Sequence, residues 1–234
     1  MSKKVALVTG GSSGIGAATA RALAHDGWHV YVAARRVENV RQIAEEIGGD
    51  WAELDVTDQK SVQSLAERIP HLDLLVNNAG GAKGLDSVAD ANVDDWRWMY
   101  ETNVLGTLHV TRAFLDKLLA AEGTIINVGS IASFTPYPGG AGYNAAKFGV
   151  RAMTSVLRQE LNGQPIRVTE IDPGRVKTDF SMVRFKGDAA KADAVYADKL
   201  NLTAEDIAES IRWVASLPAH MNIENMTIKP RDQL

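Results

Sequence analysis

Tyr143 and Lys147 are the two residues of this chain whose spacing most directly suggests chemistry. They stand four positions apart, and residues with that spacing share one face of a helix. A lysine ammonium held near a phenol favours the phenolate, so it lowers the pKa of the phenol from its usual value of about 10. A tyrosine tuned in this way can donate or accept a proton during catalysis. The same spacing also arises when a solvated lysine lies beside a half-buried tyrosine.

Ser130 adds a hydroxyl group to the same stretch of sequence, upstream of Tyr143. It follows an apolar run at 124–128 that is typical of a buried strand. We therefore expect its side chain at the carboxyl edge of a sheet, where open α/β folds build their sites. Between the two residues, segment 134–140 carries Tyr137 flanked by prolines, which we expect to form a rigid wall of the substrate pocket.

A second candidate feature is a glycine-rich turn near the start of the chain. An apolar run at 5–8 predicts a buried strand, and the pattern at 17–25 predicts a helix that Gly27 ends. Glycines between a strand and a helix let the backbone approach a pyrophosphate, and the free N–H groups of the helix start face the anion. The alternative is that these glycines only form a turn of the chain and bind no ligand. The predicted phosphate-binding residues are Gly10, Ser12, Ser13, Gly14, Ile15 and Gly16.

The residues after a second expected strand at 29–33 indicate which dinucleotide binds. An acidic side chain at this point would accept hydrogen bonds from the adenosine ribose and repel a 2′-phosphate. The chain carries Arg35 and Arg36 instead, and planar guanidinium groups suit a phosphate. We therefore predict NADP(H) over NAD(H). The alternative is that both arginines simply open a solvated helix at 37–47.

Further strands alternate with helices along the chain. Residues 54–56 are expected to close a third strand, from which Asp55 can accept a hydrogen bond from adenine while Val56 packs on its ring. A fourth apolar strand at 72–76 leads to small residues that let a cofactor lie close to the backbone, namely Asn78, Ala79 and Gly80. This order predicts right-handed crossovers and a doubly wound parallel α/β sheet in a single domain over 1–234.

Composition excludes several other classes of protein. The chain of 234 residues has a formal net charge of −4, whereas a nucleic-acid surface needs a basic stripe. It has no cysteine for disulfide or thiolate chemistry, and its histidines show no metal-ligand spacing, so we expect no metal. The sequence shows neither an apolar run of membrane-spanning length nor a signal-peptide pattern. A cytoplasmic protein that uses no membrane is the simplest interpretation.

Taken together and in this order, the motifs resemble those of the short-chain dehydrogenase/reductases. The resemblance covers almost the whole chain and implies a Rossmann-type sheet of about seven strands in three layers, a nicotinamide dinucleotide and a homotetramer. The motifs that carry it are Thr9-Gly10-x-x-x-Gly14-x-Gly16, Asn77-Asn78-Ala79-Gly80, Asn103, Ser130, Tyr143-x-x-x-Lys147 and Pro173-Gly174.

The resemblance also implies a role for each of four residues. Tyr143 would be the general acid/base of a hydride transfer, and Lys147 would lower its pKa and hydrogen-bond the nicotinamide ribose. Ser130 would hold and polarise the substrate carbonyl. Asn103, in a helical stretch expected at 96–119, would complete a proton relay through a water near Lys147.

A turn after a sixth expected strand at 166–171 would contact the nicotinamide. Its predicted cofactor residues are Pro173, Gly174, Val176 and Thr178.

The chain departs from the family pattern at two places. No basic residue directly precedes Gly14, so phosphate selection would rest on the two arginines. No glycine pair follows the last strand, so the tail from Met226 onward can instead reach a neighbouring subunit.

Residues 180–202 are expected to form a lid over the substrate. Arg184 in this segment can clamp a substrate carboxylate, the alternative being a solvated loop. This segment and the tail are similar to the NADP-dependent 3-hydroxy acid dehydrogenases, which oxidise serine and allo-threonine, and less closely to clavulanate dehydrogenase. We therefore expect an NADP-dependent oxidoreductase that interconverts a short hydroxy acid or alcohol and its aldehyde or ketone. A reductase of a larger ketone or aldehyde and a non-catalytic NADP-binding regulator are the alternatives.

Overall fold

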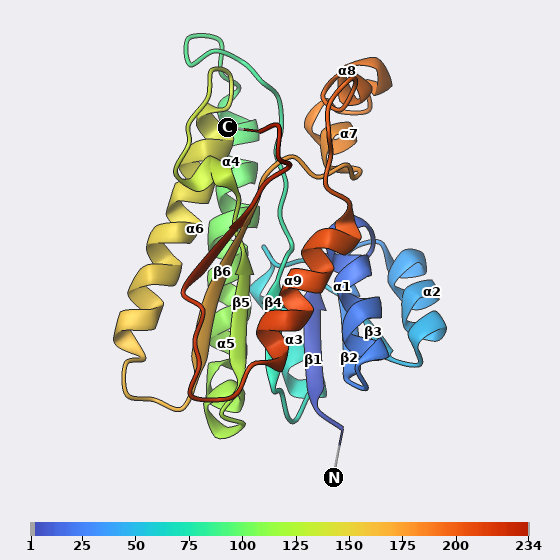
Figure 1. Cartoon of the computed structure of the whole chain (residues 1–234), viewed down its shortest axis with the longest axis vertical. Helices are drawn as coiled ribbons and strands as arrows, with labels where there is room; N and C mark the ends of the chain where they lie inside the picture. Colours follow the sequence, from blue (N-terminus) through green and yellow to red (C-terminus); the bar gives the residue numbers. More distant parts are fainter. Residues whose placement is uncertain (1–2, 234) are drawn as a thin grey trace.

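A parallel sheet forms the middle of the molecule in the computed structural model, which describes residues 3–233 (Figure 1). Within those residues the sheet has seven strands in the order β3-β2-β1-β4-β5-β6-β7, and all neighbouring strands are parallel. The strands are β1 Val5–Thr9, β2 His29–Ala34, β3 Asp50–Glu53, β4 Leu74–Asn77, β5 Thr124–Val128, β6 Arg167–Pro173 and β7 Asn225–Ile228. The strand order reverses between β1 and β4, and doubly wound sheets bind ligands at the carboxyl end of such a point.

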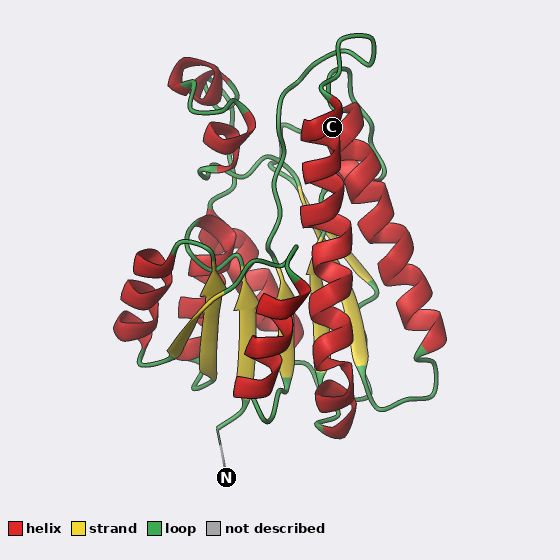
Figure 2. Cartoon of the chain, turned by 180° about the vertical axis from the view of Figure 1, so that it is seen from behind, coloured by secondary structure: helices red, strands yellow, loops and turns green. Residues whose placement is uncertain are grey.

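Helices cover both faces of the sheet, which gives three layers (Figures 1 and 2). One face packs against α1 Gly14–His25, α2 Val37–Ile47 and α9 Ala204–Ser216. The other face packs against α3 Gln59–Arg68, α5 Gly106–Ala120 and α6 Ala141–Glu160. Successive residues of β1 alternate between the two cores, because Ala6 and Val8 join the first and Leu7 joins the second. This architecture confirms the predicted doubly wound α/β fold.

The expected strands and helices lie close to where their apolar patterns indicated, with one difference at β3. That strand ends at Glu53, so residues 54–56 follow the strand and do not close it. The reason is local hydrogen bonding at Asp55. Its backbone N–H donates to Ser61 Oγ at 3.1 Å, and its carboxylate accepts from the backbone N–H and the hydroxyl of Thr57 at 2.9 Å and 2.7 Å. These bonds turn the chain away from the sheet.

The helical stretch expected at 96–119 is helical throughout, but its middle is a π-helical turn. The structure has α4 Val93–Tyr100, then a π-helical turn at Glu101–Leu105, and then α5. Asn103 lies in the π turn, and its side-chain amide donates to the Met99 carbonyl at 2.7 Å and to the Gly81 carbonyl at 2.9 Å. A side chain that bonds to the carbonyl four residues earlier competes with the helical ladder. Such π turns are frequent at functional sites.

Two segments lie over the carboxyl edge of the sheet. The segment expected to form the lid contains the short helices α7 Phe180–Arg184 and α8 Ala189–Ala194, which stand above the layers (Figure 1). The described part of the tail folds back onto its own chain. Gln233 accepts a hydrogen bond from the backbone N–H of Arg175 at 2.7 Å, and Asp232 accepts one from the Arg175 guanidinium at 2.8 Å.

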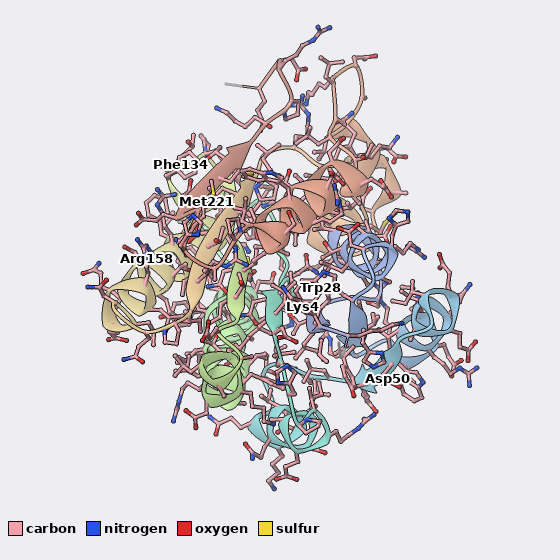
Figure 3. The ribbon with its side chains drawn as sticks, turned by 60° about the horizontal axis from the view of Figure 1, so that its bottom comes forward. Lys4, Trp28, Asp50, Phe134, Arg158 and Met221 are labelled. Carbon is pink, nitrogen blue, oxygen red and sulfur yellow. The ribbon has the colours of Figure 1, made fainter. Side chains whose placement is uncertain are left out.

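The opposite, amino edge of the sheet is closed by side-chain packing. Lys4 lies over the ring of Trp28, with Nζ 5.5 Å from the ring centroid, at the start of β1 (Figure 3). None of the described helices has the length and apolarity to cross a lipid bilayer.

Candidate active site

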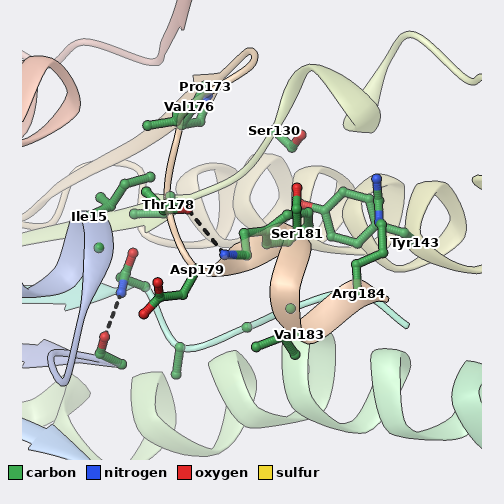
Figure 4. Close-up of a pocket in the computed structure, with 18 of the residues that line it drawn as sticks. Ile15, Ser130, Tyr143, Pro173, Val176, Thr178, Asp179, Ser181, Val183 and Arg184 are labelled. Carbon is green, nitrogen blue, oxygen red and sulfur yellow. Dashed lines mark hydrogen bonds between the residues drawn. The ribbon is translucent and has the colours of Figure 1, made fainter. Parts of the chain in front are cut away.

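A cavity of about 650 Å³ opens at the carboxyl edge of the sheet, beneath the lid segment (Figure 4). It is lined by residues from the first glycine turn, the ends of the strands, helix α6 and helix α7. It brings together the residues that the sequence predicted for cofactor and substrate, with two exceptions. Gly16 and Asn103 are not among the lining residues, and both lie immediately behind them.

The glycine turn has the backbone shape that an anion site requires. Gly10 and Gly14 have φ angles of +63° and +53°, which favour glycine. Helix α1 begins at Gly14, and Ser13 before it makes no capping hydrogen bond with its side chain, so the first N–H groups of the helix lack a side-chain acceptor. Gly16 packs inside the turn, because a Cβ there would collide with the Gly10 carbonyl and the Asn78 amide. The structure thus gives Gly16 a packing role, and its predicted contact with the cofactor stays a prediction.

Asn78 also supports the turn from below. Its side-chain amide donates to the carbonyl oxygens of Thr9 and Gly10 at 3.0 Å and 3.2 Å. The Thr9 hydroxyl in turn accepts hydrogen bonds from the backbone N–H groups of Asn78 and Ala79 at 3.0 Å and 3.1 Å. The ends of β1 and β4 are thus tied together at the switch point, and the floor of the cavity is rigid there.

Arg36 reaches across the glycine turn at the rim of the cavity. Its Nε donates to Ser12 Oγ at 3.1 Å and its Nη2 donates to Ser13 Oγ at 2.6 Å. Arg35 stands beside it and faces Asp55. Burial opposes ionisation of Asp55, but hydrogen bonds from Thr57 and the charge of Arg35 outweigh it and hold the pKa of that carboxyl below its usual value. The rim therefore presents two cations, of which Arg36 is held by the two serines of the glycine turn.

Tyr143 and Lys147 lie on one face of α6, and both are buried. The Tyr143 ring lies 5.4 Å from the Phe180 ring, centroid to centroid, and the Arg184 guanidinium carbon lies 5.1 Å from its centroid (Figure 4). The Lys147 ammonium is 5.9 Å from the Tyr143 centroid and donates to the Val128 carbonyl at 2.9 Å. Helix α7, in the segment expected to form the lid, thus packs against the tyrosine through Phe180 and Arg184.

Lys147 does not lower the pKa of Tyr143 in the way the sequence suggested. Burial raises the pKa of Tyr143 above its ordinary value, while the charge of Arg184 and a hydrogen bond with Ser130 act against the rise. Burial also lowers the pKa of Lys147 to about 8, against the charges of Glu170 and Asp172. The cation that most favours the Tyr143 phenolate is therefore Arg184 from the lid, because the Lys147 ammonium is bonded to the Val128 carbonyl.

Ser130 is fixed by hydrogen bonds at both its backbone and its side chain. Its backbone N–H donates to Asp172 Oδ1 at 2.8 Å, and its Oγ accepts from the backbone N–H of Ala132 at 3.1 Å. That second bond caps a short 3-10 helix at Ile131–Ser133. Sequence reasoning missed Asp172, which is fully buried at the end of β6. An acidic residue directly before Pro173 in an apolar strand was the signal that could have revealed it.

Asn103 holds a loop of the cavity from behind. In addition to its two donated bonds, its Oδ1 accepts from the backbone N–H of Gly81 at 3.2 Å. A Cβ at Gly80 would lie 3.8 Å from Lys147 Nζ and would press on Asn103 Oδ1, so only glycine fits between them. The predicted relay through Asn103 stays a prediction, and the observed contacts give this residue a supporting position.

Tyr137 and Arg184, which the sequence predicted as substrate contacts, both line the cavity. The Arg184 Nη2 donates to the Tyr137 hydroxyl at 2.6 Å, which shows that Tyr137 points inward. The Nε of Arg184 is buried and has no partner among the described residues. Two lid residues that sequence reasoning missed brace this region. Ser181 donates to the Tyr196 hydroxyl at 2.8 Å, and Tyr196 reaches the Thr178 carbonyl at 3.3 Å.

Fold and site define a short-chain dehydrogenase, and comparison with known proteins agrees. The sequence model of the short chain dehydrogenase family matches residues 4–189, so the chain belongs to that family and is an oxidoreductase. An uncharacterized oxidoreductase of Mycobacterium tuberculosis (strain H37Rv) is 55% identical over 99% of this chain and 92% of its own length.

Relatives with assigned activities are similar over nearly the whole chain. Sulfoacetaldehyde reductase 2 of Chromohalobacter salexigens is 41% identical, over 98% of this chain and 95% of its own. An NADP-dependent 3-hydroxy acid dehydrogenase of Escherichia coli (strain K12) is 40% identical, over 98% and 96%. Among solved structures, the closed form of serine dehydrogenase complexed with NADP+ has a TM-score of 0.96 and 39% identity, covering 98% of this chain and 96% of that one. These similarities confirm the resemblance that the motifs indicated.

Proposed function

We propose that this chain is an NADP-dependent dehydrogenase that interconverts a short anionic hydroxy compound and its aldehyde or ketone. The general class, an NADP-dependent oxidoreductase acting on hydroxy acids or alcohols, agrees with the relatives named above. The restriction to anionic substrates rests on one observation. Arg184 points into the cavity beside Tyr143 with a buried, unpartnered Nε, and such a group costs free energy unless a ligand pairs it.

The relatives support an anionic substrate by their own names. A 3-hydroxy acid carries a carboxylate, sulfoacetaldehyde carries a sulfonate, and both anions sit a few bonds away from the reacting carbon. A planar guanidinium can form two parallel hydrogen bonds with either anion. Since the Arg184 guanidinium carbon is 5.1 Å from the Tyr143 centroid, an anion bound there would leave the rest of a short substrate near the phenol.

The roles of the four predicted residues form part of this proposal. Bound NADP(H) supplies or accepts the hydride. Tyr143 donates its proton to the oxygen that becomes the alcohol and takes it back in the reverse reaction. Ser130 donates a hydrogen bond to the same oxygen, and Lys147 binds the nicotinamide ribose. Because burial raises the pKa of Tyr143, the phenol stays protonated at neutral pH and is ready to act as an acid in reduction.

The residues at the rim fit the adenosine 2′-phosphate of NADP(H). Arg36 and Arg35 supply two cations, and Ser12 and Ser13 hold the first of them over the glycine turn. The free N–H groups at the start of α1 fit the pyrophosphate. Residues 173–178 line the far wall of the cavity, where the nicotinamide would lie.

A homotetramer, a cytoplasmic location and one catalytic domain with a lid at 180–202 complete the proposal. Support for the assembly comes from exposed apolar side chains on neighbouring helices α4 and α6. Tyr100, Phe148 and Val156 are each more than two fifths exposed, at 47%, 42% and 49%. Exposed large apolar residues grouped on adjacent helices are typical of a subunit interface.

A matched substrate panel tests the anion requirement. NADP+ reduction is measured with serine and 3-hydroxypropionate, and with the uncharged amide and alcohol of 3-hydroxypropionate, for the wild type and for Arg184→Ala. We expect Arg184→Ala to lower kcat/KM for the acids by about 30-fold or more, since a charge-assisted hydrogen-bonded pair contributes roughly 2–3 kcal/mol. The uncharged substrates should change by no more than about threefold. Equal losses on both sets would contradict the clamp, and preference for bulky neutral ketones would favour the alternative reductase.

A further inference from the structure

A pair of buried carboxyl groups lies directly behind Ser130 and Lys147. Glu170 and Asp172 are two residues apart on β6, so their side chains project from the same face of that strand. Their exposed fractions are 3% and 0%. An added Cβ at Gly129 would collide with Asp172 Oδ1 and Glu170 Oε1 together, so both carboxyl groups pack against the backbone that carries Ser130.

The two carboxyl groups are partnered very unequally. Asp172 accepts hydrogen bonds at both of its oxygens. The donors are Ser130 N at 2.8 Å and Ser133 Oγ at 3.3 Å after β5, Arg151 Nη1 at 3.2 Å on α6, and Asn225 Nδ2 at 2.5 Å on β7. The Glu170 side chain makes none of these bonds, and its buried Oε1 has no partner among the described residues. Asp172 is therefore in the setting of an ionised carboxylate, and Glu170 is not.

Two carboxyl groups buried side by side repel each other when both are ionised, and only Asp172 has donors that offset its charge. Protonation of Glu170 removes that repulsion. Burial and the neighbouring charge of Asp172 raise the pKa of Glu170 to about 8. The pair therefore carries one proton at neutral pH, held on Glu170, and a single negative charge.

The charged groups that face this pair come from one helix. Lys147 and Arg151, one turn apart on α6, are the cations, and Arg151 already pairs with Asp172. The neighbouring strands contribute the uncharged Asn127 from β5 and Asn225 from β7. Lys147 donates only to the Val128 carbonyl in the described structure, and the charges of Glu170 and Asp172 favour its ammonium form against burial. The titration of Glu170 is thus coupled first to the charge of Asp172 and then, among the cations, to Lys147.

We propose that Glu170 and Asp172 are positioning residues of the active site, in which Asp172 fixes Ser130 and Glu170 releases a proton in alkaline solution to keep Lys147 charged. The inference rests on the proposed function, since it assigns its purpose to Ser130 and Lys147. Oxidation of an alcohol needs the Tyr143 phenolate, which forms only at high pH because burial raises its pKa. Under the same conditions a buried lysine would lose its charge. Ionisation of Glu170 adds a second negative charge beside Lys147 and opposes that loss.

Glu170→Gln tests this directly, because a glutamine has the shape of the protonated acid and cannot ionise. We expect kcat/KM within about twofold of the wild type near pH 6.5, and roughly a tenfold loss near pH 9.5, since one unit of pKa shift in Lys147 corresponds to a factor of ten. The control is Glu224→Gln, whose side chain is 70% exposed and lies next to β6 on the way to β7. It should leave the pH profile unchanged.

A second measurement does not depend on turnover. Infrared difference spectra of the wild type should show the carbonyl band of a protonated carboxylic acid at neutral pH, and this band should disappear as the pH rises through about 8 and be absent in Glu170→Gln. Absence of the band from the wild type, or its persistence in the variant, would overturn the assignment of the proton. A normal band with an unchanged alkaline limb in Glu170→Gln would overturn the coupling to Lys147.

Failure of the proposed function would look different. If the wild type oxidised no short hydroxy acid, the pH profile would be measured with whichever alcohol or carbonyl compound it accepts. A normal infrared band in the wild type, together with a shift of the alkaline limb of the pH profile in Glu170→Gln, would support the role of Glu170 and Asp172. The same result would reject the proposed class of substrate.

Discussion

Replacement of Arg36 by alanine should convert a cofactor preference into a near-equal affinity for the two dinucleotides. In the structure the guanidinium bonds to Ser12 at 3.1 Å and to Ser13 at 2.6 Å, which directs it toward the turn without consuming all of its donors. A hydrogen bond to a charged partner contributes about 1.5–3 kcal/mol. Because Arg36 is exposed and Arg35 stays in place, the lower half of that range applies, and NADPH binding should weaken roughly 10- to 40-fold.

The assay is the dissociation constant of NADPH and of NADH, followed by cofactor fluorescence at low and at high salt. NADH affinity should change less than about twofold in Arg36→Ala, since NADH lacks the phosphate, and added salt should weaken NADPH more than NADH. The matched control is Arg41→Ala. Arg41 is an exposed arginine on the same helix, paired with Glu38 at 2.9 Å, so this variant removes the same charge away from the cavity.

Two results would refute the reasoning about the rim. One is an equal loss of NADH and NADPH affinity in Arg36→Ala, which would mean that the guanidinium holds the turn and does not bind the phosphate. The other is an equal loss of NADPH affinity in Arg36→Ala and Arg41→Ala, which would reduce the effect to net charge. If NADH binds the wild type as tightly as NADPH, the prediction of phosphate selection is wrong at the outset.

Two further predictions follow from the same geometry. Oxidation of the alcohol should accelerate as pH rises above neutrality, because the raised pKa of Tyr143 keeps the phenol protonated at neutral pH. Reduction should be constant around neutral pH and slow down in alkaline solution. The rates of the wild-type enzyme in the two directions should therefore show opposite pH trends, and parallel trends would contradict the role of Tyr143. Gly129→Ala should lower the free energy of unfolding, measured in urea, by about 2–4 kcal/mol, because the added methyl group meets the buried oxygens of Glu170 and Asp172. The control is Gly163→Ala, at a glycine with no neighbouring atom within 4 Å but with a φ of +84°. This change should lower the free energy of unfolding by about 1 kcal/mol. If the Gly129→Ala protein were as stable as the Gly163→Ala protein, Glu170 and Asp172 would not pack against Gly129 as the structure shows.

Apolar patterning located most of the fold. Strand β5 lies at Thr124–Val128, as its pattern predicted, because a continuous apolar run suits a doubly covered strand. The helix expected at 37–47 is α2 Val37–Ile47. The gathering of the site residues was also predictable, since the carboxyl ends of parallel strands meet at one edge. Ser130 and the glycine turn lie on one cavity for that reason.

The remaining features depend on contacts between distant parts of the chain. The Asn103 amide at the π turn bonds to the Gly81 carbonyl, which lies 22 residues away, as well as to the nearby Met99 carbonyl, and no local pattern encodes the distant bond. The direction of the pKa shift of Tyr143 follows from its burial beneath Phe180 and Arg184 of the lid, whereas the sequence suggested only the lysine on its own helix. Gly16 also packs against the Gly10 carbonyl and the Asn78 amide, a close approach that the glycine motif alone does not describe.

The most direct test of the whole account is single-turnover kinetics of Tyr143→Phe against the wild type. Both proteins are loaded with NADPH and mixed with a short aldehyde that carries a carboxylate or a sulfonate, and loss of NADPH is followed. We predict that Tyr143→Phe binds NADPH within about twofold of the wild type and reduces the aldehyde at least about a thousandfold more slowly, because the proton donor is gone. Reduction by Tyr143→Phe at a rate near that of the wild type would contradict the assignment of Tyr143 and the mechanism built on it.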